Sequence, residues 1–130
     1  MEDSKSVITP SDSRAKLPHG ALTTKKNQKE KLYRELTGSI MYLTVATRPD
    51  ISFVVNRLVQ FNENYEEEHW SAVKYILRYL HGTQRYELLF RIDSERLTVL
   101  SNVDQTNDVN DRITYTGYVF NLSGTAITWH

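Results

Sequence analysis

The sequence predicts an α+β fold in which helices come first along the chain and strands follow. Apolar residues recur at intervals of three and four between residues 28 and 82, which is the period of amphipathic helices. After Gly82 the chain changes to short runs of β-branched and aromatic residues, which are typical of strands. Ser123 and Gly124 separate the last two runs and form a hairpin signal.

The composition of the 130 residues excludes several classes of protein. With 39% hydrophobic and 25% charged residues, the chain is expected to be globular, and a net charge of zero argues against a strongly basic nucleic-acid binder. The absence of cysteine excludes disulfides and thiolate metal sites. No apolar run reaches the roughly 20 residues that cross a bilayer, and the polar start lacks a secretory signal. We therefore expect an intracellular protein of the cytoplasm or nucleus, without a membrane partner.

Residues 1–27 are predicted to form a flexible N-terminal arm. This stretch contains Pro10, Pro18 and Gly20 and shows no apolar periodicity, so it cannot bury enough surface to offset the entropy of ordering. A basic cluster near its end could contact phosphate or remain solvated; it comprises Lys25, Lys26, Lys29 and Lys31.

The first helix is predicted from about Gln28 to Ala46. Its apolar stripe consists of Leu32, Leu36, Ile40 and Leu43. Gly38 lies in the middle of this helix, where glycine costs about 1 kcal/mol relative to alanine, so we expect a close approach of another element there.

Two further helices are predicted between residues 49 and 82. Pro49 suits the first turn of a helix that runs to about Phe61, and Asp50 complements its positive end. A third helix is predicted over Glu67–His81, with Gly82 as its stop. The expected core of the helical region comprises Leu36, Ile40, Ile51, Leu58, Trp70, Ile76, Leu77 and Leu80.

The remaining chain is predicted to form an antiparallel β-meander of about four strands. The four runs are Tyr86–Phe90, Leu97–Val103, Ile113–Leu122 and Thr125–Trp129. The chain stops at His130 as the last run ends, so we expect an incomplete sheet with an exposed face and marginal stability.

Two groups of side chains are candidates for chemistry. Asp104, Asp108 and Asp111 follow a predicted strand and could hold Mg²⁺ or form turns. The end of the third helix carries a basic stripe that could contact nucleic acid or remain solvated: Lys74, Arg78 and His81, with Arg85 beyond. The four histidines are scattered, and each is expected to be exposed or to cap a helix.

Several ordered motifs resemble the Pol polyproteins of copia-type LTR retrotransposons. They are YRELTGSIMYL (33–43), TRPDI (47–51), HWSAVK (69–74), ILRYLHGT (76–83), DR (111–112) and GYVF (117–120). The resemblance runs from about Thr9 to Trp129, which is nearly the whole chain.

The resemblance implies a position after the palm of the reverse transcriptase. Residues 28–82 would form a helical thumb or connection-like region, and residues 83–130 a truncated RNase H-like antiparallel meander. The palm aspartates that hold Mg²⁺ in the intact parent family would lie upstream, so this chain alone is not expected to polymerise DNA.

The same resemblance places the leading RNase H aspartate of the family at Asn102. Asparagine keeps an oxygen ligand but loses the negative charge that attracts a hard cation. Asp104 and Asp108 remain as candidates for catalysis, and no metal or other cofactor is expected for this chain.

Three functional hypotheses follow from the sequence. The first is a catalytically inactive fragment of a reverse transcriptase/RNase H polyprotein. The second is a non-enzymatic module that binds nucleic acid, such as an RNA–DNA hybrid, or the rest of a Pol polyprotein through Lys74, Arg78 and Arg85. The third is a working nuclease that uses Asp104 and Asp108 with a divalent metal.

Overall fold

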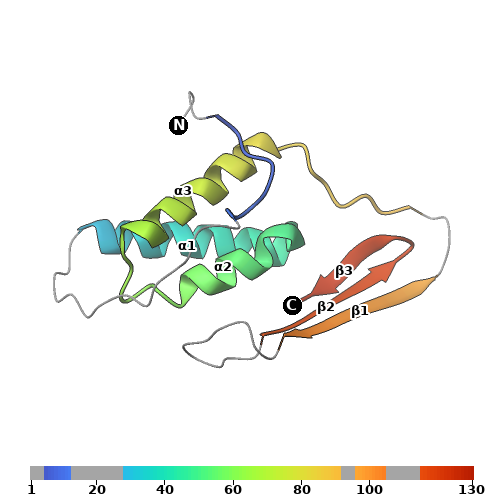
Figure 1. The fold of residues 1–130 in the computed structure, drawn as a ribbon. Coiled ribbons are helices and arrows are strands. Elements are labelled where there is room, and N and C mark those ends of the chain that lie inside the picture. Colours follow the sequence, from blue (N-terminus) through green and yellow to red (C-terminus); the bar gives the residue numbers. More distant parts are fainter. Residues whose placement is uncertain (1–4, 13–27, 92–95, 105–114) are drawn as a thin grey trace. The chain divides into compact units, whose positions relative to one another are not determined.

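Figure 1 shows the computed structural model of the chain, which describes residues 5–12, 28–91, 96–104 and 115–130. The chain divides into two compact units, Met1–Tyr86 and Glu87–His130. The first unit is helical and the second contains antiparallel strands, which confirms the predicted α+β class.

The helical unit contains the three predicted helices within its described residues. Pro49 occupies the first turn of a short 3-10 helix that leads directly into the second α-helix, as its fixed φ favours. The elements are α1 (Gln28–Ala46), η1 (Pro49–Ile51), α2 (Ser52–Val59) and α3 (Glu67–Gly82).

The buried side of α1 differs from the predicted stripe, because Leu32 is 45% exposed. From residue 31 of α1 onward, where burial is described, the buried residues are Tyr33, Thr37, Ile40 and Thr44. Thr37 can occupy this side because its hydroxyl donates to the carbonyl of Tyr33 (2.9 Å) and to the side-chain oxygen of Asn62 (2.9 Å). A pattern that counts only apolar residues misses threonines whose hydroxyls are satisfied in this way.

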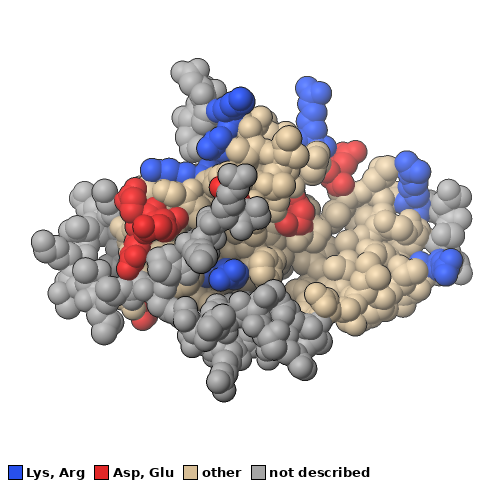
Figure 2. Space-filling model, in the orientation of Figure 1, with Lys and Arg blue, Asp and Glu red and all other residues tan. Residues whose placement is uncertain are grey.

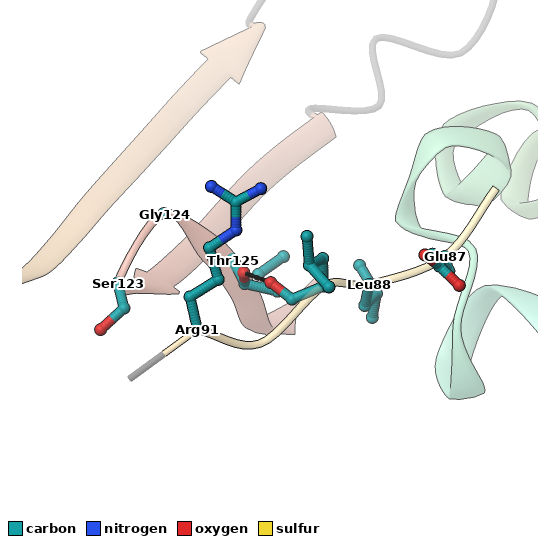
Figure 3. A pocket seen from close by; sticks show the side chains of 8 residues that line it. Glu87, Leu88, Arg91, Ser123, Gly124 and Thr125 are labelled. Carbon is teal, nitrogen blue, oxygen red and sulfur yellow. Dashed lines mark hydrogen bonds between the residues drawn. The ribbon is translucent and has the colours of Figure 1, made fainter. Parts of the chain in front are cut away.

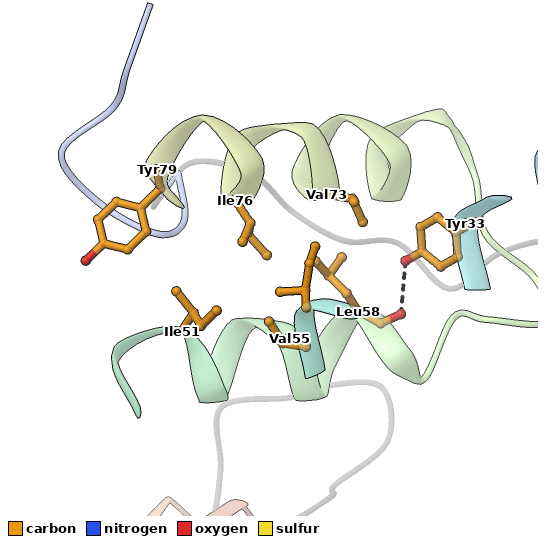
Figure 4. Packing of buried hydrophobic residues seen from close by; sticks show 8 residues of the cluster. Tyr33, Ile51, Val55, Leu58, Val73, Ile76 and Tyr79 are labelled. Atoms are coloured by element: carbon orange, nitrogen blue, oxygen red, sulfur yellow. Dashed lines mark hydrogen bonds between the residues drawn. The ribbon is translucent and has the colours of Figure 1, made fainter. Parts of the chain in front are cut away.

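The hydrophobic core of the helical unit lies between α3 and the other helices (Figure 4). Val73 and Ile76 of α3 are fully buried, and Figure 4 shows them pointing toward the residues of α2. Tyr33 is also fully buried, and its hydroxyl donates to the carbonyl of Leu58 at 3.0 Å. Burial raises the pKa of the Tyr33 phenol above its ordinary value, so the group remains a protonated donor.

The predicted core residues all belong to this core, either as buried residues or as partly buried ones that pack against them. Four of them are buried: Ile40, Ile51, Leu58 and Ile76. Four are partly buried and pack against the first group: Leu36, Trp70, Leu77 and Leu80. The cluster is completed by Tyr33, Val55, Val73 and Tyr79.

Both ends of α3 are stabilised by local hydrogen bonds. At the start, the backbone N–H of Glu66 donates to Nδ1 of His69 (2.9 Å), whose side chain is fully buried. This confirms a capping role for one of the histidines. At the end, the N–H of Thr83 donates to the carbonyl of Tyr79 (3.0 Å). Gly82 is therefore the last residue of the helix rather than a stop beyond it.

The expected close approach at Gly38 is wrong. Gly38 is exposed in the middle of α1, and a Cβ at this position would meet no atom within 4 Å. Its backbone is helical, so glycine gives no steric advantage here.

We predict that Gly38→Ala stabilises the helical unit by about 0.5–1 kcal/mol, since alanine loses less backbone entropy in a helix. The midpoint of urea unfolding, followed by helical circular dichroism, measures this change. A lower midpoint would show that Gly38 is required for a contact.

Part of the N-terminal arm packs on α3. Nε of Arg78 donates to the carbonyl of Lys5 at 2.8 Å. Val7 is half-buried and packs against the helical core. The arm predicted over residues 1–27 therefore includes a described stretch, residues 5–12, with defined contacts to a helix.

The second unit contains a three-stranded antiparallel meander within its described residues. Its strands are β1 (Leu97–Asp104), β2 (Tyr115–Leu122) and β3 (Thr125–Trp129), in the spatial order β1-β2-β3. The additional strand predicted over Tyr86–Phe90 is wrong, because this stretch joins no ladder. The hydroxyl of Thr125 donates to the carbonyl of Leu89, so a side chain satisfies a backbone group there.

The hairpin between β2 and β3 is confirmed. Leu122 pairs with Thr125, and the two residues between them have φ values of 51° (Ser123) and 80° (Gly124). Positive φ at both positions is the signature of a type I′ turn, whose twist matches that of the strands.

One face of the meander exposes apolar side chains. The register places Leu97 opposite Leu122 and Val99 opposite Phe120, and residues that pair directly lie on the same face of a sheet. Leu97 and Val99 are 56% and 51% exposed.

In the helices among the described residues, we find none whose length and apolar character would allow it to span a bilayer.

Candidate functional site

The predicted basic stripe lies on the C-terminal half of α3. Lys74 and Arg78 are four residues apart in the helix, so they share one of its faces. Lys74 is exposed, and its Nζ lies 5.5 Å from the centroid of the Trp70 ring. The guanidinium carbon of Arg78 lies 5.8 Å from the centroid of the Tyr75 ring. Each cation thus rests against an aromatic side chain, which holds it near the helix surface.

The structure brings only part of the stripe together. His81 is exposed in the last turn of α3, and Arg85 is exposed beyond the helix end. Figure 2 shows that lysine and arginine side chains of the described residues are scattered among neutral and acidic ones on the face in view. Of the predicted basic residues, only Lys74 and Arg78 lie one turn apart in α3 and rest against aromatic rings.

The predicted acidic site is only partly within the described residues. Asn102 lies in β1 opposite Gly117, and the backbone of Asp104 lies at the end of the same strand, opposite Tyr115. Asp108 and Asp111 lie outside the described residues. Within the part of the chain that the structure describes, no three histidine or acidic side chains are grouped so that they could hold a metal ion.

An ion pair at the end of α3 was not predicted. Arg48 is 7% exposed and forms a bidentate pair with Asp50, through Nε to Oδ1 (2.9 Å) and Nη2 to Oδ2 (2.8 Å). The same guanidinium donates to Thr83, from Nη2 to the hydroxyl at 2.7 Å and from Nη1 to the carbonyl at 3.3 Å. Arg48 therefore connects the turn after α1 to the residue that caps the C-terminal end of α3. We call Arg48, Asp50, Tyr79 and Thr83 the arginine clamp.

The clamp satisfies the polar groups that it buries. The hydroxyl of Tyr79 donates to Oδ2 of Asp50 (2.8 Å), and the hydroxyl of Thr83 donates to the carbonyl of Tyr79 (2.8 Å). The guanidinium carbon of Arg48 also lies 5.4 Å and 5.6 Å from the ring centroids of Tyr79 and Tyr86. These hydrogen bonds use four of the five N–H donors of the guanidinium, so Arg48 serves mainly to join elements of the helical unit.

The charges of the clamp shift the pKa values of its members. Burial alone would raise the pKa of the Asp50 carboxyl, but hydrogen bonds from Arg48 and Tyr79 outweigh it and hold the pKa below its ordinary value. The hydrogen bond to Asp50 raises the pKa of Arg48, despite the opposing effect of burial. Burial and the hydrogen bond to Asp50 raise the pKa of Tyr79.

We predict that the clamp contributes an acid-sensitive part of the stability. Because the pKa of Asp50 is lower in the folded chain than in the unfolded chain, its contribution is present above about pH 4, the unfolded value, and is lost as pH falls through the folded value. Urea unfolding between neutral and acid pH should show a smaller loss of stability in Asp50→Asn than in the parent chain. Equal losses in both proteins would contradict a lowered pKa at Asp50. Glu35→Gln, at an exposed position of α1, is the matched control.

A shallow pocket of about 400 Å³ lies beside the β2–β3 hairpin (Figure 3). Its lining includes Glu87, Arg91 and Thr125. The hydroxyl of Thr125 already donates to the backbone carbonyl of Leu89, and Figure 3 shows the Ser123 side chain pointing away from the others. Ligand pockets usually present several polar groups that converge, and these side chains do not.

The clamp residues coincide with two of the sequence motifs. Arg48 and Asp50 belong to TRPDI, and Tyr79 and Thr83 belong to ILRYLHGT. The signal that could have revealed the clamp was an arginine and an aspartate on either side of Pro49, together with a tyrosine and a threonine four residues apart at a helix end. Their contact bridges 35 positions of sequence, so no local period predicts it.

No family model and no solved structure matches the chain. Three curated proteins show how the chain is related to others. It is 39% identical to the Retrovirus-related Pol polyprotein from transposon TNT 1-94 of Nicotiana tabacum, over 99% of this chain and 10% of that protein. It is 35% identical to the Retrovirus-related Pol polyprotein from transposon RE2 of Arabidopsis thaliana, over 99% of this chain and 9% of that protein. The third relative is Secreted RxLR effector protein 161 of Plasmopara viticola, at 42% identity over 75% of this chain and 69% of that protein.

The chain thus spans about a tenth of the length of the transposon polyproteins that it matches. The similarity to them covers both the helical unit and the meander, since nearly every residue of the chain is aligned. The motif resemblance is confirmed by these matches: nearly the whole chain is similar, at 35% to 39% identity, to a segment of retrovirus-related Pol polyproteins from transposons.

Proposed function

We propose that the chain corresponds to the segment of a copia-type Pol polyprotein that follows the reverse-transcriptase palm and enters the RNase H domain. In the parent polyprotein this segment would serve RNA-directed DNA synthesis and transposition. The observation that carries the proposal is the match to transposon Pol polyproteins over 99% of the chain, at 35% to 39% identity. The order of elements agrees with it, since a helical unit precedes an antiparallel meander.

The helical unit would act as a scaffold rather than as a catalyst. Two of its buried polar residues, Arg48 and Thr83, belong to the arginine clamp, in which Arg48 donates to Asp50 and Thr83. Within the part of the chain that the structure describes, the two cations of α3 contact aromatic rings rather than acidic groups: Lys74 lies on Trp70, and Arg78 on Tyr75.

We also propose that this chain alone does not cleave the RNA strand of a hybrid. Asn102 occupies the β1 position of the family's leading aspartate and is uncharged, so it attracts Mg²⁺ less than a carboxylate would. Asp104 is two residues further along the same strand, a displacement of about 6.5 Å. Metal–ligand distances tolerate only small errors, so Asp104 is a poor substitute at that position.

A chimeric transposon tests this placement. The matching segment of the tobacco Pol polyprotein is replaced by this chain, with either Asn102 or Asn102→Asp. Both chimeras are expected to make DNA from the element's RNA, and only the Asn102→Asp chimera is expected to degrade the RNA strand of the hybrid.

Two results would count against the proposal. A chimera that accumulates to the normal level but makes no DNA would contradict the position after the palm. Equal hybrid cleavage by both chimeras would contradict the role assigned to position 102.

A second function is favoured by the side chains of α3. Lys74 is exposed on the face of Trp70, and Arg78 is one turn away above Tyr75. Paired cations and aromatic rings suit contacts with phosphates and bases. The helical unit would then bind nucleic acid without cleaving it. The salt dependence of binding to duplex or hybrid tests this function, because true phosphate contacts weaken steeply as salt rises.

A further inference from the structure

Residues 5–12, which we call the N-terminal strap, contact Arg78 of α3. Nε of Arg78 donates to the backbone carbonyl of Lys5 at 2.8 Å. The strap also reaches the aromatic partner of this arginine, since the hydroxyl oxygens of Thr9 and Tyr75 lie 3.4 Å apart. Figure 1 shows the strap running beside the C-terminal half of α3.

Gly82 allows the strap to come this close to the helix. A Cβ at Gly82 would lie 2.7 Å from the Cβ of Ser6, which is far below a normal contact distance. Because the Cβ of Ser6 is attached directly to the backbone, the strap itself would have to move. Tyr75, Arg78 and Gly82 are spaced by three and four residues, so the contacts of the strap follow one face of α3.

The strap offers Arg78 a weaker partner than a nucleic acid would. A backbone carbonyl is neutral, whereas a phosphate is charged and can accept two parallel hydrogen bonds from the guanidinium fork. One of the two edges at which a guanidinium can bind a phosphate includes Nε. In Arg78 the Nε–H already donates to the carbonyl of Lys5. Lys74, one turn earlier on the same face, is exposed and could contact the same backbone phosphates.

We propose that the N-terminal strap competes with nucleic acid for Arg78, so that the docked strap lowers the affinity of α3 for nucleic-acid phosphates. This inference rests on the second proposed function, the binding of nucleic acid by α3. The competition is reciprocal by linkage: release of the strap raises the affinity for nucleic acid, and nucleic acid loosens the strap by the same factor.

Gly82→Ala in the full chain tests the competition without changing the net charge. The new methyl group displaces the strap, while alanine favours the helix. Gly38→Ala is the matched control, because its methyl group meets open space on α1. Affinity for a short DNA duplex is measured at several salt concentrations for both variants and for the parent chain.

We expect Gly82→Ala to bind the duplex at least about fivefold more tightly than the parent at low salt, as typical coupling energies imply. The slope of log affinity against log salt should steepen by about 0.9, the value for one additional phosphate contact. Gly38→Ala should bind as the parent does. Adding Arg78→Met to Gly82→Ala should remove the gain.

A second variant and a second measurement keep the test decisive if Gly82→Ala unfolds the chain. Val7→Ser weakens the docking of the strap and is also neutral in charge, since Val7 packs against the helical core. It should show the same gain in affinity. Hydrogen exchange of the strap amides should become faster in the parent chain when duplex is added.

Two outcomes would overturn the proposal, and they can be told apart. If parent and strap-released variants bind the duplex equally, the competition is wrong but nucleic-acid binding stands. If no variant binds the duplex in a salt-dependent way, both the competition and the proposed binding function are wrong.

Discussion

Arg48→Met is expected to destabilise the helical unit by about 3–5 kcal/mol, the usual cost of removing one partner of a buried ion pair. Methionine keeps most of the side-chain volume but leaves the Asp50 carboxylate and the Thr83 hydroxyl without the donors that the guanidinium supplies. Asp50 is 33% exposed, so water relieves part of the cost, and the lower end of the range is expected. Urea unfolding of the full chain measures the change.

Two controls separate the clamp from a general effect of charge. Arg48→Lys keeps the charge but cannot reproduce the planar fork that bonds Asp50 and Thr83 together, so it should also be destabilising. Lys31→Met removes an exposed cation that pairs with Glu35 at 3.8 Å, and should change stability by no more than about 0.5 kcal/mol. If Arg48→Met cost as little as Lys31→Met, the clamp would not stabilise the fold.

Ile76→Ala is expected to cost about 2–5 kcal/mol, because it removes buried methyl groups and leaves a cavity. Ile76 is fully buried in α3 and lies in the core between this helix and the rest of the unit (Figure 4). Val45→Ala is the matched control, since Val45 is 73% exposed on α1 and should tolerate truncation.

The fluorescence of Trp70 makes this measurement specific to the helical unit. A Trp129→Phe background removes the tryptophan of the second unit, so the remaining signal reports on the residue that packs against the helical core. An unfolding midpoint of Ile76→Ala equal to that of Val45→Ala would contradict the core described above.

The fold was largely predictable from the sequence because most elements carry local signals. The helices follow the spacing of apolar residues, and Ser123 and Gly124 fix the turn between β2 and β3 through their positive φ values. The buried side of α1 was not predictable in the same way, since Thr37 occupies a core position only because its hydroxyl finds acceptors. Tyr86–Phe90 has the composition of a strand, but composition cannot show that a stretch lacks a pairing partner.

The candidate site was predictable only where it is local. Lys74 and Arg78 could be placed on one face of α3 from their spacing alone. The arginine clamp joins residues 35 positions apart, and the strap brings Lys5 to Arg78 across 73 positions. Such contacts depend on how the elements pack against one another, and the local spacing of residues does not predict this packing.

A cleavage assay on an RNA–DNA hybrid, with the purified chain in Mg²⁺ and separately in Mn²⁺, measures directly whether the chain is a nuclease. We propose that a neutral side chain at position 102 leaves the chain unable to hold the metal ions that an RNase H needs. We expect no metal-dependent cleavage by the chain, and none by Asp104→Ala. Turnover in Mg²⁺ that Asp104→Ala abolishes would contradict this proposal.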